Sequence, residues 1–164
     1  MGAVLWWGIP MKQHTYRMEV EWTGNDGDGT RSYTGYRRDH RISAPGKAAI
    51  NGSSDPAFRG DPSRYNPEEL LVASLSACHM LWYLHLASAR GVSVLDYRDE
   101  ARGVMAEQAD GAGEFVEVTL APVVRVRAGD DRALALALHE EAHRFCFIAR
   151  SVKFEVKVEA RVEG

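Results

Sequence analysis

The sequence predicts an α+β fold built from two helices and mostly antiparallel β-sheet. Two stretches, 66–90 and 132–149, have the length and composition of helices, and segments of alternating apolar and polar residues surround them. Those segments come in pairs joined by short turns, which is typical of hairpins rather than of parallel crossovers. The predicted order is therefore ββ(β)–α–ββ–α–β, in one domain from residue 12 to residue 164.

Length and composition are those of an ordinary globular domain. The chain has 164 residues, 45% hydrophobic and 26% charged, enough for one hydrophobic core. A formal charge of −3 gives no general attraction to nucleic acid or to an anionic membrane. Two cysteines are too few for a secreted disulfide scaffold, and the chain has no run of 18 apolar residues. We therefore expect a cytoplasmic protein with no nucleic-acid or membrane partner.

Residues 1–11 stand apart from the predicted domain. Their apolar run is very short and lacks the basic region that opens a signal peptide. We interpret them as an N-terminal extension, either a loosely packed arm or residues ahead of a true start at Met11.

The chain before the first helix predicts a small sheet and a long loop. Residues 15–22 alternate as a half-buried strand does, and the glycine-rich stretch 24–29 is a strong turn signal. Residues 30–36 then predict the returning strand of a hairpin, and 37–44 a third short strand. The segment 44–65 has no periodicity, and a loop of that length inside a domain is often functional.

The first predicted helix has clear start and stop signals. Asn66 suits the N-cap, Pro67 the first helical position, and Glu68 and Glu69 the positive end of the helix dipole. Gly91 is a suitable end point. Because the helix is apolar almost all the way round, other elements or a second chain must cover it.

The second half of the chain predicts two long strands, a helix and a last strand. Residues 92–107 and 114–127 form a hairpin through an Asp-Gly turn, and Pro122 implies an edge or a bulge. The helix 132–149 follows an Asp-Asp cap, and residues 152–162 alternate cleanly as a strand.

The two cysteines are the candidate reactive groups. Cys78 and Cys146 each lie in a predicted helix, where a lone cysteine is as often a small core residue as a functional one. A reactive thiol needs a nearby cation or a helix N-terminus. Cys78 lies about three turns into its helix, so we expect a cation from the preceding loop, where Arg59 and Arg64 are the candidates.

A second motif points to a different chemistry. His139-Glu140-Glu141-Ala142-His143 matches the H-E-x-x-H pattern of zinc peptidases on a predicted helix. The remaining candidates for a third ligand lie on a predicted strand or tail: Glu155, Glu159 and Glu163. The charges around the motif are also typical of a solvated helix face. A zinc peptidase is therefore a remote alternative.

The motif Asn66-Pro67-Glu68-Glu69-Leu70, with Cys78 ten residues after Glu68 and Cys146 ahead of a final strand, resembles the OsmC/Ohr family. The resemblance covers nearly the whole chain from about residue 12. His79 after the first cysteine and Phe147 after the second depart from the family pattern and indicate a divergent subgroup. The resemblance implies antiparallel sheets wrapped around two central helices, in an intertwined homodimer with active sites at the subunit interface.

The resemblance also implies a function: the protein would be a thiol peroxidase that acts on organic hydroperoxides and uses no metal or organic cofactor. Cys78 looks like the peroxidatic cysteine and Cys146 like the resolving one. An external dithiol would then reduce their disulfide. The alternative is a non-catalytic dimeric binding or redox-sensing module with inert thiols on the same fold.

Two charged residues complete the implied site. Glu68 looks like the carboxylate that holds a catalytic arginine, and Arg59 is preferred for that arginine to Arg64 or Arg31. In a straight helix Glu68 and Cys78 are roughly 15 Å apart along the axis. We therefore expect the Glu68–Arg59 pair to serve the Cys78 of the other subunit.

Overall fold

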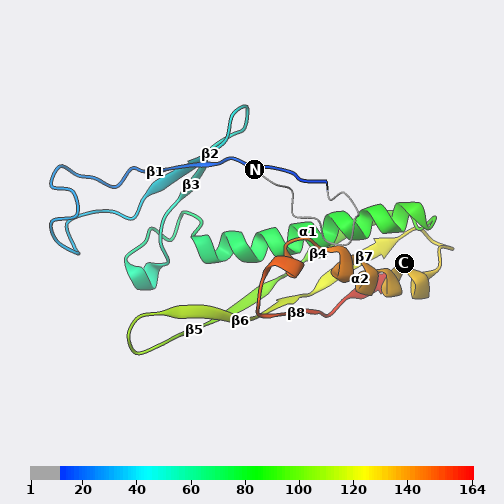
Figure 1. Ribbon diagram of the computed structural model, residues 1–164. Coiled ribbons are helices and arrows are strands. Elements are labelled where there is room, and N and C mark those ends of the chain that lie inside the picture. Colours follow the sequence, from blue (N-terminus) through cyan, green and yellow to red (C-terminus); the bar gives the residue numbers. More distant parts are fainter. Residues whose placement is uncertain (1–11) are drawn as a thin grey trace. The chain divides into compact units, whose positions relative to one another are not determined.

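The computed structural model describes residues 12–164, so the extension predicted over residues 1–11 lies outside the described chain. The chain forms two compact units, one ending at Asn66 and the other running from Pro67 to Gly164 (Figure 1).

The first unit contains a three-stranded antiparallel sheet in the order β1-β2-β3. Its strands are β1 (Glu19–Trp22), β2 (His40–Ser43) and β3 (Ile50–Gly52), and a short 3-10 helix, η1 (Pro56–Phe58), follows. The partner of β1 is β2, with Trp22 opposite His40. Part of the segment predicted as a loop therefore forms the third strand.

The prediction of a returning strand over residues 30–36 is wrong. These residues form turns and bends, because their two tyrosines pack locally around a cation. The Arg38 guanidinium lies 4.5 Å from the ring centre of Tyr33 and 4.0 Å from that of Tyr36. Trp22 Nε1 also donates a 2.8 Å hydrogen bond to the carbonyl of Arg37.

The second unit contains both long helices and two mixed three-stranded sheets. The helices are α1 (Pro67–Ala89) and α2 (Arg132–Phe145), and a 3-10 turn, η2 (Ala149–Ser151), follows α2. The sheet orders are β4-β7-β9 and β5-β6-β8. The strands are β4 (Val94–Asp99), β5 (Arg102–Glu107), β6 (Gly113–Leu120), β7 (Pro122–Val126), β8 (Glu155–Val158) and β9 (Arg161–Glu163).

Each long strand predicted in this unit is divided in two. The hairpin pairs β4–β7 and β5–β6 are antiparallel, as predicted, whereas β8 and β9 pair in parallel with β6 and β7. The divisions fall where the ladder is interrupted. Pro122 has no N–H to give, and the N–H of Ala121 donates instead to Asp99 Oδ1 at 2.7 Å. The long predicted hairpin, a β-ribbon, therefore passes from the β4-β7-β9 sheet into the β5-β6-β8 sheet.

The first helix begins and ends where the sequence predicts. Glu68 and Glu69 occupy its first turn, and Gly91 follows it with φ 75°, a left-handed conformation that suits glycine. Its length and composition would also suit a membrane span, a property shared by core helices of soluble proteins.

The core of the second unit lies between α1 and α2 and beneath the sheets. Tyr83 on α1 donates a 3.0 Å hydrogen bond to the Ala135 carbonyl, and His79, one turn earlier on α1, meets His139, one turn later on α2. The two helices therefore run antiparallel. The buried residues of α2 recur at helical spacing: Ala135, Leu138, His139 and Ala142.

The second helix is shorter than predicted. It is capped by Asp131, whose carboxylate accepts the Leu134 N–H at 3.0 Å, and its last helical residue is Phe145 rather than residue 149. Cys146 is the C-cap, with an extended backbone (φ −61°, ψ 110°). The second thiol therefore stands at the end of a helix and not within it. Overall, the predicted α+β class with two helices among hairpin-based sheets is confirmed.

Candidate active site

The structure brings the two cysteines together. Cys78 comes from the middle of α1 and Cys146 from the end of α2, and both are free thiols. The two thiols lie close enough to interact, because the Cys78 side chain is among the groups that raise the pKa of Cys146. The antiparallel packing of the helices creates this proximity, because it brings the middle of α1 near the C-terminus of α2. The sequence alone did not show whether these two thiols lie near each other.

The surroundings of Cys146 keep it protonated. It is 1% exposed, and burial raises the pKa of its thiol to about 11, with a further rise from the neighbouring Cys78. The backbone N–H groups of Ala149 and Ile148 oppose the rise, and the former lies 3.5 Å from Sγ. Cys78 is only partly buried. The pair thus consists of one thiol that small molecules can reach and one that is shielded.

An apolar surface lies beside the thiols. Trp82, one turn beyond Cys78, stacks on Phe145 with ring centres 5.1 Å apart and meets the edge of Phe147 at 5.5 Å. Phe147 is 64% exposed, although it directly follows the shielded Cys146. Leu81, Trp82 and His85 line a small hollow of about 240 Å³. This surface suits a hydrophobic substrate, and the aromatic residues flanking the second cysteine were its only sequence signal.

The two predicted charged residues lie in different units. Glu68 is in the first turn of α1, in the second unit, whereas Arg59 belongs to the first. Arg59 ends η1 with φ 66°, the one left-handed residue other than glycine within 12–164. Such strained positions cluster at functional sites. The Glu68–Arg59 pair itself stays a prediction.

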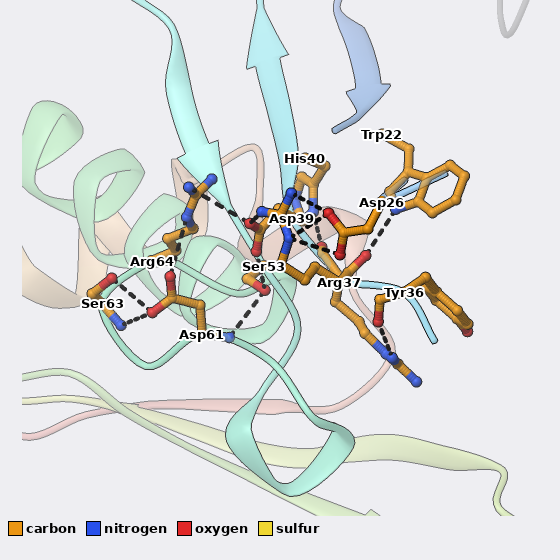
Figure 2. Close-up of polar contacts among 11 residues, drawn as sticks. Trp22, Asp26, Tyr36, Arg37, Asp39, His40, Ser53, Asp61, Ser63 and Arg64 are labelled. Atoms are coloured by element: carbon orange, nitrogen blue, oxygen red, sulfur yellow. Dashed lines mark hydrogen bonds and ion pairs between the residues drawn. The ribbon is translucent and has the colours of Figure 1, made fainter. Parts of the chain in front are cut away.

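The competing loop arginine is held by carboxylates of its own unit (Figure 2). Arg64 lies 3.3 Å from Asp61 and 3.7 Å from the buried Asp39, which also accepts a 2.5 Å bond from Arg37. Arg59 has no carboxylate partner among residues 12–66 and lies 6.0 Å from the ring centre of Tyr33. A structural role therefore accounts for Arg64, which favours Arg59 as the functional arginine.

The first histidine of the H-E-x-x-H motif is engaged by another histidine. His139 is buried on α2, and its Nδ1 lies 3.0 Å from Nε2 of the buried His79 on α1. Its ring stacks on Tyr83 with ring centres 3.9 Å apart. Burial lowers the pKa of His79 to about 4 and that of His139 to about 3. Within the described chain, no group of three or more His, Cys, Asp or Glu side chains is placed to hold a metal ion.

Comparison with known proteins agrees with this architecture. The model of the OsmC-like protein family matches residues 60–161. An OsmC-like protein of unknown function from Vibrio cholerae has 30% identity and a TM-score of 0.80, over 92% of this chain and all of that one. The uncharacterized protein YmaD of Bacillus subtilis is 23% identical over 158 residues, 93% of this chain and 97% of its own.

A third relative is named for its function. An organic hydroperoxide resistance protein from Legionella pneumophila shares the fold, with 18% identity and a TM-score of 0.65, over 93% of this chain and all of that one. The family match over residues 60–161 and the 30% identity to the Vibrio cholerae protein show that the chain belongs to the OsmC family.

Proposed function

We propose that this protein is a cysteine-based peroxidase that reduces organic hydroperoxides to alcohols in cytoplasmic oxidative-stress defence. The observation that carries the proposal is the proximity of the free thiols of Cys78 and Cys146, from the middle of α1 and the end of α2. The existence of hydroperoxide resistance proteins with the same fold supports it.

The first step takes place at the accessible thiol. The thiolate of Cys78 attacks the distal oxygen of the hydroperoxide, the O–O bond breaks, and the sulfur becomes a sulfenic acid. The departing alkoxide takes up a proton and leaves as the alcohol. The Arg59 guanidinium, held by Glu68, stabilises the thiolate and the charge that develops on the leaving oxygen. The apolar surface around Trp82 and Phe147 accommodates the organic part of the substrate.

The second step uses the shielded thiol. Cys146 attacks the sulfur of the sulfenic acid, a disulfide forms, and water leaves. An external dithiol then reduces the disulfide and restores both thiols. The burial of Cys146 suits this order, because peroxide reaches Cys78 first.

The complete site is proposed to need two subunits. Glu68 and Cys78 are ten residues apart on one continuous helix, roughly 15 Å along its axis. Outward-facing positions on α1 at four-residue spacing are small or apolar: Ala73, Ala77 and Leu81. Such a face suits close packing against a second copy of the helix. The Glu68–Arg59 pair of one subunit would then serve the Cys78 of the other.

Mass spectrometry after addition of one equivalent of cumene hydroperoxide tests the proposal. The expected product is the Cys78–Cys146 disulfide, with the peroxide consumed. Cys78→Ser should abolish consumption, whereas Cys146→Ser should stop at an oxidised Cys78. Two free thiols beside unconsumed peroxide would instead support a non-catalytic binding or redox-sensing module.

A further inference from the structure

Four residues of α2 lie along one flank of the helix. They stand at the spacing i, i+3, i+4 and i+7, which places side chains on the same side of a helix: Leu136, His139, Glu140 and His143. The H-E-x-x-H motif supplies three of the four. The motif therefore marks a continuous surface of the second unit.

This flank forms one wall of a cavity. The cavity is open and has a volume of about 420 Å³, and the chain from β8 to β9 supplies its remaining lining residues: Val156, Val158, Glu159 and Ala160. In Figure 1, α2 lies alongside β8. Half of the lining residues are aliphatic and half are polar. A cavity of this size with apolar walls and a few polar groups is typical of a small-molecule site.

The polar part of the cavity is acidic. Glu140 and Glu159 line it, and its lining residues include neither lysine nor arginine. The adjacent Glu141, which does not line the cavity, lies 3.1 Å from Arg90. Within residues 12–164, Glu140 and Glu159 have no such cationic partner. Both carboxylates are therefore available to a cation from outside the chain.

The imidazoles of the cavity also have unused hydrogen-bonding capacity. His143 Nδ1 is buried and has no partner within the described chain. His139 is 3% exposed; its Nδ1 lies 3.0 Å from His79 Nε2, whereas its Nε2 is buried and unpartnered. Buried polar groups normally have a partner, and a neutral imidazole can accept one hydrogen bond. The cavity wall thus offers an acceptor in addition to the two carboxylates.

The spacing of these groups selects the kind of cation. Within residues 12–164, no three His, Cys, Asp or Glu side chains converge closely enough to hold a metal ion. A cationic ligand must therefore spread its hydrogen-bond donors over a wider span than a single ion covers. An ammonium group is a compact point charge, whereas a guanidinium group presents five N–H donors in one plane and stays charged at physiological pH.

We propose that this cavity binds a small guanidinium compound that carries a short apolar chain. The guanidinium group donates hydrogen bonds to the carboxylates of Glu140 and Glu159 and to the imidazole of His143. The apolar chain packs against the aliphatic walls. This binding uses neither thiol and goes beyond the proposed peroxidase activity.

Isothermal titration calorimetry with butylguanidinium tests the site. Butylammonium and butanol carry the same apolar chain, and butyrate reverses the charge. We expect butylguanidinium to bind about tenfold more tightly than butylammonium or butanol, and butyrate not to bind. N-acetylarginine methylamide is the second guanidinium probe. If it binds more tightly than butylguanidinium, the source of the group is an arginine side chain; if it binds more weakly, the source is a free guanidine.

The informative variants are Glu140→Gln and Glu159→Gln, which keep the shape of the side chain and remove its charge. Each should weaken the binding of butylguanidinium about tenfold, because a charge-assisted hydrogen bond becomes a neutral one. Both positions are exposed, so we expect both variants to fold. Glu141→Gln is the matched control, because Glu141 is paired with Arg90, and it should keep the wild-type affinity.

The imidazole signals in proton–carbon correlation spectra locate the ligand. Butylguanidinium should shift the signals of His143 and leave those of His85, which lines a different hollow on α1, unchanged. Any of four results would overturn the proposal: no binding of butylguanidinium at millimolar concentration, an equal affinity for butylammonium or butanol, an undiminished affinity in both Glu140→Gln and Glu159→Gln, or a shift of His85 in place of His143. Peroxide takes no part in these measurements, so they test the site separately from the proposed function.

Discussion

Ser76 and Asp99 are joined by a 2.5 Å hydrogen bond that fixes α1 to the corner where β4 ends. The second oxygen of the Asp99 carboxylate accepts the Ala121 N–H at 2.7 Å, at the matching corner between β6 and β7. One carboxylate therefore ties the central helix to both corners of the β-ribbon.

Asp99→Ala should destabilise the protein more than a surface substitution does. It leaves the partly buried Ser76 hydroxyl and the Ala121 N–H without their acceptor, at a cost of about 1–3 kcal/mol. Urea unfolding followed by circular dichroism measures the loss. Ser88→Ala removes a hydroxyl from an exposed position on the same helix and is expected to change the free energy of unfolding by less than about 0.5 kcal/mol. Equal values for the two variants would contradict this role of Asp99.

Stability should fall as the pH drops below neutrality. The pKa values of His79 and His139 are about 4 and about 3 when folded, below the ordinary value near 6.5 when unfolded. Between these values the unfolded chain binds more protons, so the stabilisation is complete above about pH 6.5 and is lost as the pH falls towards 4. The slope is at most about 1.4 kcal/mol per pH unit for each histidine.

The double variant His79→Leu, His139→Leu provides the comparison for this pH dependence. Its free energy of unfolding, measured in urea from pH 7 to pH 5, should vary less with pH than that of the wild type. Parallel curves for the two proteins would contradict the prediction, because the two histidines would then contribute nothing to the pH dependence of the free energy of unfolding.

Gly103→Ala should strain the contact between β5 and α1. A Cβ at this position would lie 2.6 Å from the Phe115 ring and 2.7 Å from the Val72 side chain. Overpacking of this kind typically costs about 1–3 kcal/mol. Thermal unfolding should show a lower Tm, and Val72→Ala in the same chain should restore part of it by making room. An unchanged Tm for Gly103→Ala alone would contradict the prediction, because it would mean that the sheet moves there without a cost in stability.

Subunit mixing tests the proposed two-chain site. Glu68→Gln and Cys78→Ser should each inactivate their own homodimer. In a mixed dimer, one site combines an intact Glu68 with an intact Cys78 if the two come from different chains. Refolding the variants together should then recover about a quarter of the wild-type peroxide consumption, because half of the dimers are mixed and each has one whole site. No recovery above the separate variants would place both residues of a site in the same chain.

The local signals in the sequence were reliable where a single side chain decides the backbone. Pro67 and Gly91 bound α1, and Asp131 caps α2, because each acts on its own turn of the helix. The division of the ribbon at Pro122 was indicated only as a possible bulge. Its cause, the capture of the Ala121 N–H by Asp99, joins residues 22 positions apart.

The site followed the same rule. Cys78 and Cys146 were identified by their rarity, but their proximity depends on how two helices pack, which no local pattern encodes. The bond between His79 and His139 spans 60 residues, and its only sequence traces were an H-E-x-x-H motif that suggested a metal and an unexpected histidine after Cys78. Tyr33 and Tyr36 misled the strand prediction because aromatic residues suit a strand as well as they suit a cation.

Because Cys146 stands at the end of α2, formation of a disulfide would displace Cys146 more than Cys78. Cys78 is anchored in the interior of a 23-residue helix, where any displacement strains consecutive turns. Cys146 has an extended backbone and leads into a turn before η2, so a small torsional change at Cys146 can move its sulfur while both helices remain intact. The oxidised and reduced forms would therefore differ mainly over residues 146–151, which include the exposed Phe147. In the proposed cycle, the redox state of a buried sulfur would thus change the surface, and a reductant could distinguish one form from the other.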